Sequence, residues 1–302
     1  MTNLSMKQLR YFDALARHRH FGRAAEECAV TQPALSVQIK ELEELIGTPL
    51  VERSARQIHL TGFGLSFAER TRDILRSVHD LEEFARSNNG QLGGQFRFGI
   101  IPTVAPYLLS SFITEMMACY PGLDLRPREA KTQILIQDLM ESRLDAAIVA
   151  LPISEPTIRE LALFDEEFVL LRPASEVDKP IPSPDLLPEM RLLLLEEGHC
   201  FRDQALSYCS GKASSTRTLM EGSSLTTLVQ MVAAGIGVTL IPEMAVDLET
   251  GSAKVSVSHM ADPRPSRTIG MIWRKSNPLE EQLLEIAEIF RKIGTSGKTG
   301  MS

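Results

Sequence analysis

The chain has few of the residues that mark secreted, metal-binding or membrane proteins. It contains four cysteines among 302 residues, and no two of them have the CxxC spacing, so we expect neither a disulfide framework nor structural zinc. No apolar run approaches the length of a membrane span, and charged residues interrupt the first twenty positions where a signal peptide would be apolar. We therefore expect a cytoplasmic protein with no membrane partner, metal or cofactor.

A strongly basic surface is also missing. The formal net charge is -7. Residues 1–60 carry eight basic and seven acidic side chains, which leaves 24 basic and 32 acidic residues, a net of -8, for the remainder. Charge therefore supports nucleic-acid binding by the N-terminal segment only weakly. The length, with 43% hydrophobic and 24% charged residues, fits two or three globular domains.

Three helices are predicted in the first fifty residues. Apolar spacing predicts the first over Met6–Arg17 and a second, shorter one from Phe21 to Cys28. The third runs from about Gln32 to Ile46, with Thr31 as its cap and Pro33 in its first turn. Its polar side suits contacts with base edges and phosphates, which indicates a helix-turn-helix with the third helix as recognition helix. Taken singly, such polar residues are more often just a solvated helix face.

A long helix is predicted over residues 61–87. Leu65, Ile74, Val78, Leu81 and other apolar residues recur there at helical spacing. A single helix with one apolar seam needs a partner, so we expect the seam to support dimerisation. The asparagine and glycine residues of 88–94 then interrupt the pattern as a hinge.

Beyond the hinge, short apolar strands alternate with helices, which predicts α/β structure with mostly parallel sheets. The expected strands are Phe96–Ile101, Leu123–Glu129, Leu144–Leu151, Phe168–Leu171, Leu192–Leu195, Val238–Ile241 and Thr268–Trp273. A final helix is expected over Pro278–Ile293.

One segment carries candidate thiol chemistry. Gly198 follows an apolar strand, and Arg202–Tyr208 favours a short helix, so Cys200 is expected at the helix entrance. The helix dipole and the positive charge of His199 and Arg202 would favour a reactive thiolate there. Cys209 lies about 13 Å further along such a helix, beyond disulfide reach. Free cysteines are, however, more often small buried hydrophobic residues.

These segments resemble a known family. Four segments follow one another as in the winged helix-turn-helix of LysR-type transcriptional regulators: Phe21–Ala25, Thr31–Ser36, Leu42–Leu50 and Leu60–Thr61. The sequence departs from that pattern at Val51 and Phe63. Residues 198–205 with the later Cys209 look like the cysteine segment of the peroxide-sensing members of that family, with Phe201 where leucine is common. Segments 100–104 and 129–132 are similar to the segments of these peroxide-sensing regulators whose threonine hydroxyls help to hold peroxide. A threonine that follows a strand can, however, simply cap a helix.

The resemblance implies a fold that is α/β overall. It consists of a winged helix-turn-helix DNA-binding domain (1–60), a linker helix and hinge (61–90) and a regulatory domain (91–302). The regulatory domain would have two α/β subdomains like those of periplasmic binding proteins, one at about 92–163 and 267–293 and the other at about 164–266. The implied partners are a double-stranded DNA operator, a second copy in a homodimer or homotetramer, and RNA polymerase.

The resemblance also implies residue roles, with hydrogen peroxide as the signal. The redox-active pair would be Cys200 and Cys209. The residues that would bind peroxide are Thr103, Thr132, His199, Arg202, Asp203 and Gln204. The residues that would contact DNA are Thr31, Gln32, Pro33, Ser36, Gln38, Lys40, Arg53 and Arg56.

Two other functions stay open from the residues alone, and a third fails. A LysR-type regulator could instead bind a small-molecule inducer between its subdomains. A thiol peroxidase would use Cys200 as a turnover catalyst, but the helix-turn-helix pattern speaks against an enzyme. A solute-binding protein of a transporter would need the signal peptide that the sequence does not show.

Overall fold

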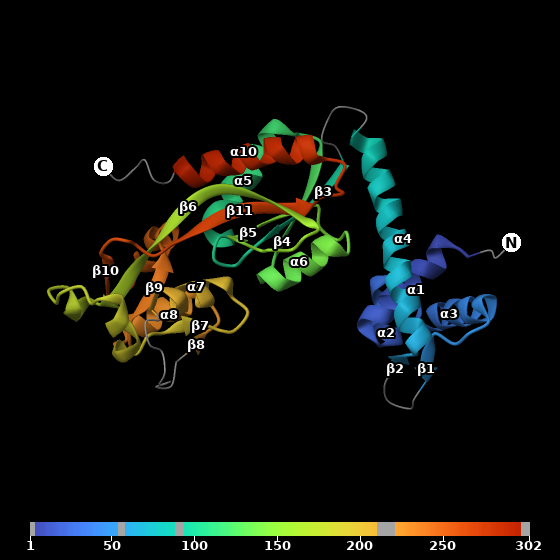
Figure 1. Cartoon of the computed structure of the whole chain (residues 1–302), viewed down its shortest axis with the longest axis horizontal. Coiled ribbons are helices and arrows are strands. Elements are labelled where there is room, and N and C mark those ends of the chain that lie inside the picture. Colours follow the sequence, from blue (N-terminus) through green and yellow to red (C-terminus); the bar gives the residue numbers. More distant parts are fainter. Residues whose placement is uncertain (1–3, 54–57, 88–93, 210–220, 297–302) are drawn as a thin grey trace. The chain divides into compact units, whose positions relative to one another are not determined.

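The structure is a computed structural model that describes residues 4–53, 58–87, 94–209 and 221–296 (Figure 1). The chain divides into two compact units, Met1–Ala85 and Arg86–Ser302. The first unit has one buried core and the second has two, and the units are described separately below.

The N-terminal unit is a winged helix-turn-helix, as the sequence predicts. Its elements are α1 (Met6–His18), α2 (Phe21–Glu27), α3 (Gln32–Ile46), β1 (Val51–Arg53), β2 (Ile58–Leu60) and α4 (Gly62–Ser87). The predicted bounds of α3 are confirmed. Local signals set these bounds, since the Thr31 hydroxyl caps the start of the helix and Gly47 ends it with a φ of 75°. Strands β1 and β2 pair antiparallel as the wing.

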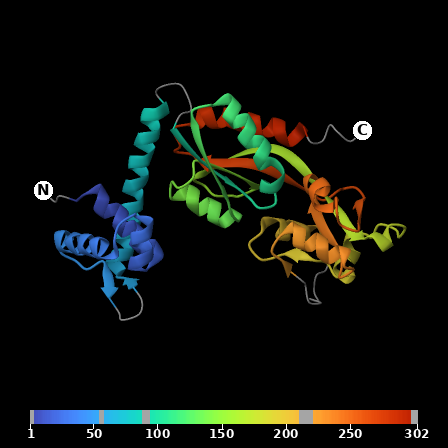
Figure 2. The ribbon, with the colours of Figure 1, turned by 180° about the vertical axis from the view of Figure 1, so that it is seen from behind.

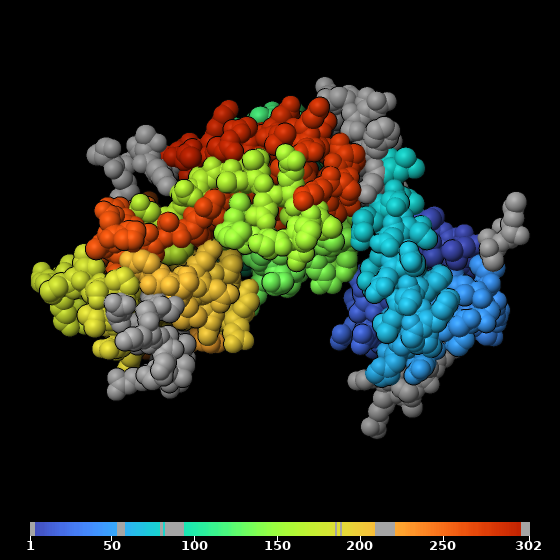
Figure 3. Space-filling model, viewed as in Figure 1, coloured from blue at the N-terminus to red at the C-terminus, as the bar shows by residue number. Residues whose placement is uncertain are grey.

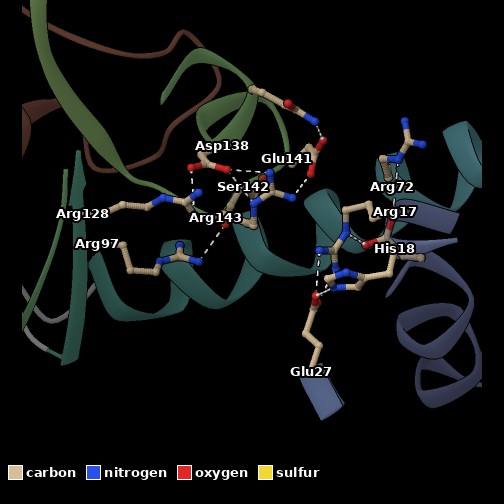
Figure 4. Close-up of polar contacts among 12 residues, drawn as sticks. Arg17, His18, Glu27, Arg72, Arg97, Arg128, Asp138, Glu141, Ser142 and Arg143 are labelled. Carbon is tan, nitrogen blue, oxygen red and sulfur yellow. Dashed lines mark hydrogen bonds and ion pairs between the residues drawn. The ribbon is translucent and has the colours of Figure 1, made fainter. Parts of the chain in front are cut away.

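Long-range packing holds these three helices together. Phe12 and Leu15 of α1 and Leu35 and Ile39 of α3 are completely buried in one core. Arg17 of α1 adds an ion pair with Glu27 of α2 (Figure 4). The apolar face of α3 is therefore fixed against α1, and its opposite face is turned outward.

Helix α4 packs only partly within this unit. Ala68 is completely buried in the helix-turn-helix core. Leu65, Ile74 and Leu81 remain 49%, 42% and 65% exposed. Because Ile74 and Leu81 are seven residues apart, they lie on one side of the helix. Ile74 and Leu81 therefore form an exposed apolar seam on α4, and its role in dimerisation stays a prediction.

The regulatory unit is built on a sheet with strand order β10-β6-β11-β5-β3-β4, with β9 also paired to β6 (Figure 1). The strands are β3 (Gly94–Ile100), β4 (Leu123–Glu129), β5 (Ala146–Leu151), β6 (Ile158–Pro173), β9 (Thr239–Pro242), β10 (Val255–His259) and β11 (Ser266–Arg274). A separate parallel pair consists of β7 (Leu194–Leu195) and β8 (Glu221–Gly222).

Helices pack against the strands in both halves of the unit. They are α5 (Ala105–Cys119), α6 (Thr132–Met140), α7 (Cys200–Cys209), α8 (Leu225–Ala233), α9 (Val246–Thr250) and α10 (Glu280–Ser296), with short 3₁₀ turns at Ala174–Glu176, Pro184–Met190 and Glu243–Ala245. Helix α10, red in Figure 3, lies along the outside of the unit. Its Phe290 packs against Phe112 of α5 and Phe98 of β3.

The long strands β6 and β11 run between the two halves of the regulatory unit (Figure 2), and each half has its own buried core. The first core contains residues of β3, β5, α5 and α10, and the second contains residues of β7, β9, α8 and the C-terminal part of β6. The regulatory unit therefore has two separate cores joined by two strands, and the bounds of its two subdomains stay a prediction.

The expectation of mostly parallel sheets is wrong. Strand β3 is parallel to β4 and β5. Strand β6, however, is antiparallel to β9, β10 and β11, and β11 is antiparallel to β5. The chain crosses between the two halves on β6 and returns on β11, so the crossing strands run in opposite directions. The sequence hides the length of β6 because charged residues of 165–167 interrupt its apolar pattern.

Candidate functional site

Helix α3 offers a polar surface to a partner. Gln32 and Pro33 are exposed, and Ser36 and Gln38 are half-buried. The Gln38 amide donates a hydrogen bond to the Glu41 carboxylate at 2.6 Å. Lys40 is 68% exposed, and its ammonium lies 3.5 Å from a Glu44 carboxylate oxygen.

The remaining predicted DNA contacts are less well described. Thr31 serves first as the helix cap, since its hydroxyl accepts from the Ala34 amide at 3.4 Å. Arg53 ends β1 in the wing, whereas Arg56 lies outside the described residues. Val37, 54% exposed on α3, is a surface residue that the sequence analysis did not select. An apolar side chain of this kind suits contact with a thymine methyl group.

Cys200 is the first residue of α7, as predicted. Gly198 makes the turn before the helix with a φ of +88°, a conformation that glycine adopts without steric cost. Cys200 is half-buried and packs against the first core of the regulatory unit. The next residue, Phe201, is 2% exposed and packs in the second core. The thiol therefore lies at the boundary between the two halves.

A small cavity opens beside this cysteine. It is lined by Ile101, Pro102, Thr103, Lys131, Thr132, Gly198, His199 and Cys200. The volume open to the centre of a water-sized molecule is about 10 Å³, close to what a single water needs. The end of β3, the start of α6 and the start of α7 therefore enclose room for one very small molecule.

Two threonine hydroxyls in this cavity are buried. The Thr103 hydroxyl accepts a hydrogen bond of 2.7 Å from Arg267, which also donates to the Thr103 carbonyl at 3.0 Å. Thr103 therefore keeps its own hydroxyl hydrogen for another acceptor. Among the residues that the structure describes, the Thr132 hydroxyl has no hydrogen-bond partner. A buried hydroxyl of this kind is satisfied by a small polar molecule in the cavity.

Arg267 is a site residue that the sequence analysis missed. Its side chain is fully buried and forms an ion pair of 2.7 Å with Glu166. Its guanidinium also lies 5.4 Å from the ring centre of Phe201. Arg267 thus joins Thr103 of the first half to α7 of the second. No local motif marks it, because it follows Thr103 by 164 residues.

The positive charge at the cavity differs from the one expected. Burial lowers the pKa of His199, the nearby Lys131 lowers it further, and Glu196 opposes the shift. His199 is therefore neutral at pH 7 and acts as a hydrogen-bonding group. Arg202 is directed elsewhere, since it donates to the Leu195 carbonyl at 2.8 Å and to Glu221 at 2.7 Å. Lys131 is the cation that lines the cavity.

The structure thus brings together four of the predicted residues, Thr103, Thr132, His199 and Cys200. Arg202, Asp203 and Gln204 lie in the first half of α7 and are not among the residues that line the cavity. The bond from Arg202 to Leu195 instead fixes the start of α7 against β7.

Helix α6, which carries Thr132, is fixed at its far end by buried charge (Figure 4). The Asp138 carboxylate is completely buried and lies 2.5 Å from Arg143 and 3.0 Å from Arg128. Only the carboxylate is buried, since the Arg143 and Arg128 side chains are 32% and 48% exposed, so solvent weakens each ion pair while the buried charge still depends on both. This pairing therefore fixes the position from which Thr132 and Lys131 reach the cavity.

Cys209 is the last residue of α7. It follows Cys200 by nine residues in one helix, which corresponds to about 13 Å along the axis. Disulfide formation requires a Cα separation below about 7 Å. The two cysteines therefore cannot be joined while α7 is intact.

Comparison with known proteins identifies the family. Residues 6–65 match the bacterial regulatory helix-turn-helix protein family model of the lysR type, and residues 89–293 match the LysR substrate binding domain. The chain belongs to the LysR family. The predicted LysR-type regulator with a helix-turn-helix is thereby confirmed, and the family is one of transcription regulators rather than enzymes. LysR-family regulators bind DNA and oligomerise.

Relatives within the family are similar over most of their length. The DNA-binding transcriptional dual regulator OxyR of Escherichia coli K12 is 39% identical over 294 residues, 95% of each chain. A probable hydrogen peroxide-inducible genes activator of Streptomyces viridosporus is 40% identical over 294 residues, with 95% of this chain and 94% of the relative covered.

Solved structures show the same likeness. A full-length OxyR variant from Pseudomonas aeruginosa has a TM-score of 0.75 and 37% identity, with 96% of both chains covered. A Corynebacterium glutamicum OxyR mutant with hydrogen peroxide bound has a TM-score of 0.67 and 31% identity over 99% of this chain and 96% of that one. In the described ranges of this chain, no helix is long and apolar enough to cross a membrane.

Proposed function

We propose that this LysR-family regulator senses hydrogen peroxide through Cys200 and transmits the oxidation to its DNA-binding unit. The observation that carries the proposal is the cavity beside Cys200, which has room for one small molecule and contains the buried hydroxyls of Thr103 and Thr132. A larger inducer does not fit this cavity. Peroxide, which has two hydroxyl groups to donate and accept hydrogen bonds, suits its size and its polar lining.

The chemistry begins with the thiolate, the reactive form of cysteine. The sulfur of Cys200 attacks one peroxide oxygen, the O–O bond breaks, and the products are a sulfenic acid and hydroxide, which takes up a proton to become water. The Thr103 and Thr132 hydroxyls donate hydrogen bonds to the oxygens of the peroxide. Neutral His199, at the same wall of the cavity, accepts the proton of the Cys200 thiol and returns it to the departing hydroxide.

The second step joins the two cysteines. The Cys209 thiol attacks the Cys200 sulfenic acid, forming a disulfide and releasing water. For this α7 must unwind, and the bonds from Arg202 to Leu195 and Glu221 must break with it. On the chain-entropy estimate, closing a loop of about ten residues costs the unwound segment ~2.7 kcal/mol. The free energy of thiol oxidation by peroxide covers this cost, and the crosslinked segment then favours a second packing of the regulatory unit.

The proposal extends to the assembly and its partners. The protein acts in the cytoplasm as a homodimer or homotetramer on a two-fold related DNA operator and works with RNA polymerase. Gln32 and Ser36 approach bases, Lys40 contacts phosphate, and Arg53 and Arg56 of the wing reach the flanking minor groove. Repacking of the oxidised regulatory units changes the spacing of the paired helix-turn-helix units and so the DNA footprint.

Mass spectrometry tests the thiol assignment directly. Reduced protein is treated with one equivalent of hydrogen peroxide, quenched by alkylation and digested. We expect early sulfenic acid at Cys200 followed by a Cys200–Cys209 crosslink, with Cys28 and Cys119 still alkylated. Modification that starts at Cys28 or Cys119 would contradict the assignment.

DNA recognition gives a separate prediction. Gln32→Ala should weaken binding to the operator far more than binding to random duplex, because a base-edge contact gives about 1 to 3 kcal/mol of discrimination. Fluorescence anisotropy on both duplexes measures the difference. Gln133→Ala removes the same amide from α6 and should change neither affinity; equal losses on both duplexes for Gln32→Ala would remove Gln32 from the base-reading set.

Lys40→Ala should behave differently. Removal of a phosphate contact should weaken binding to operator and random duplex alike and reduce the slope of log affinity against log salt by about one. A salt titration measures this slope. Lys292→Ala removes the same charge from α10 and serves as the control, and a selective loss on the operator would instead make Lys40 a base-reading residue.

A further inference from the structure

Lys131 connects the two halves of the regulatory unit at the thiol cavity. It occupies the N-cap position of α6, on the side of the first core. Its ammonium donates a 2.7 Å hydrogen bond to the Glu197 carbonyl, in the turn that precedes α7. Its side-chain carbons also lie beside Gly198, where an added Cβ would be 3.2 Å from the Lys131 Cδ atom. The side chain therefore covers this turn and lines the cavity with Cys200.

The other described bonds of the turn stay within its own half. The Glu196 amide donates to the carbonyl of Gly222 in β8 at 3.1 Å, and the His199 amide donates to the Glu196 carbonyl at 3.4 Å. Neither bond holds the turn against the end of β3 and the start of α6, near which Thr103 and Thr132 lie. The bond from Lys131 to Glu197 holds the turn against α6.

We propose that Lys131 is a positioning residue that holds the Glu196–His199 turn against α6 and so keeps Cys200 and His199 at the cavity. The inference rests on the proposed function, because it concerns the reaction of Cys200 with peroxide. When α7 unwinds, the turn moves and the bond to Glu197 breaks, so Lys131 favours the reduced arrangement.

The oxidation rate of Cys200 tests the proposal in full-length reduced protein. Quenched-flow alkylation with hydrogen peroxide as the probe gives the second-order rate constant for each variant. Lys131→Met keeps the side-chain carbons but loses the donor and the charge, and should react about tenfold more slowly, which corresponds to ~1.4 kcal/mol. Lys131→Arg keeps both and should restore most of the rate.

Lys179→Met is the matched control. The Lys179 ammonium also lies 2.7 Å from an oxygen, that of Glu176, but on an exposed turn of the second half. The same loss of charge there should leave the rate unchanged. A Lys131→Met variant that reacts at the unmodified rate would overturn the proposal, as would a slow rate that Lys131→Arg does not restore.

The titration of His199 provides a readout that does not depend on peroxide. Lys131 and Glu196 are the charged groups that act on His199, and the Cys200 thiol is its neighbour. Since Lys131 lowers the pKa of His199, Lys131→Met should raise it, as followed by NMR of the imidazole protons. An unmoved titration in Lys131→Met counts against the proposal. If the unmodified protein fails to oxidise at Cys200 while the titration shifts as expected, the proposed function fails and the placement of Lys131 stands.

Discussion

Replacing Cys200 by serine should abolish the response to peroxide. A serine hydroxyl has nearly the same size, but it does not ionise near neutral pH and does not form a sulfenic acid. Cys200→Ser should therefore give the footprint of the reduced protein at every peroxide dose, measured by nuclease protection of the operator. Binding to DNA in the absence of peroxide should be unchanged, because Cys200 belongs to the regulatory unit and the recognition helix to the other.

Two control variants separate this effect from general thiol loss. Cys119→Ser removes an exposed cysteine at the end of α5 and should keep the full response. Cys209→Ser should still form the sulfenic acid, so its response should be blunted or transient rather than absent. A Cys200→Ser protein that still changes its footprint with peroxide would show that another group senses the oxidant.

Local signals made the DNA-binding unit predictable. The helix bounds of α3 follow from Thr31, Pro33 and Gly47, and its buried face from the spacing of Leu35 and Ile39. Each signal acts within a few residues of its effect, so the sequence alone places these elements. The start of α7 at Cys200 follows in the same way from Gly198.

The cavity itself depends on contacts that no local pattern contains. Arg267 reaches Glu166 because β11 and β6 pair antiparallel in a register that places the two residues opposite each other. Sheet register is set by the whole fold, so neither this pair nor its bond to Thr103 could be predicted from spacing. For the same reason the direction of β6 was missed, and the charge at the cavity was assigned to His199 and Arg202 rather than to Lys131.

Charge placed on the seam of α4 should dissociate the assembly. Ile74 and Leu81 are 42% and 65% exposed on one side of the helix, and a second copy of α4 is the proposed cover. Ile74→Asp with Leu81→Asp would bury uncompensated carboxylates at ~3 to 5 kcal/mol each. Even one such cost raises the dissociation constant at least about 100-fold. Light scattering should then report a monomer.

Operator binding should fall with the assembly, because a monomer reads one half-site and loses the gain from binding two linked sites. Helicity by circular dichroism should be kept, since both side chains project away from the helix-turn-helix core that Ala68 joins. Val177→Asp places the same charge on an apolar side chain that is 60% exposed in the regulatory unit, and should leave the assembly intact. Unmodified protein that is already monomeric by light scattering would mean that the exposed side of α4 has another partner.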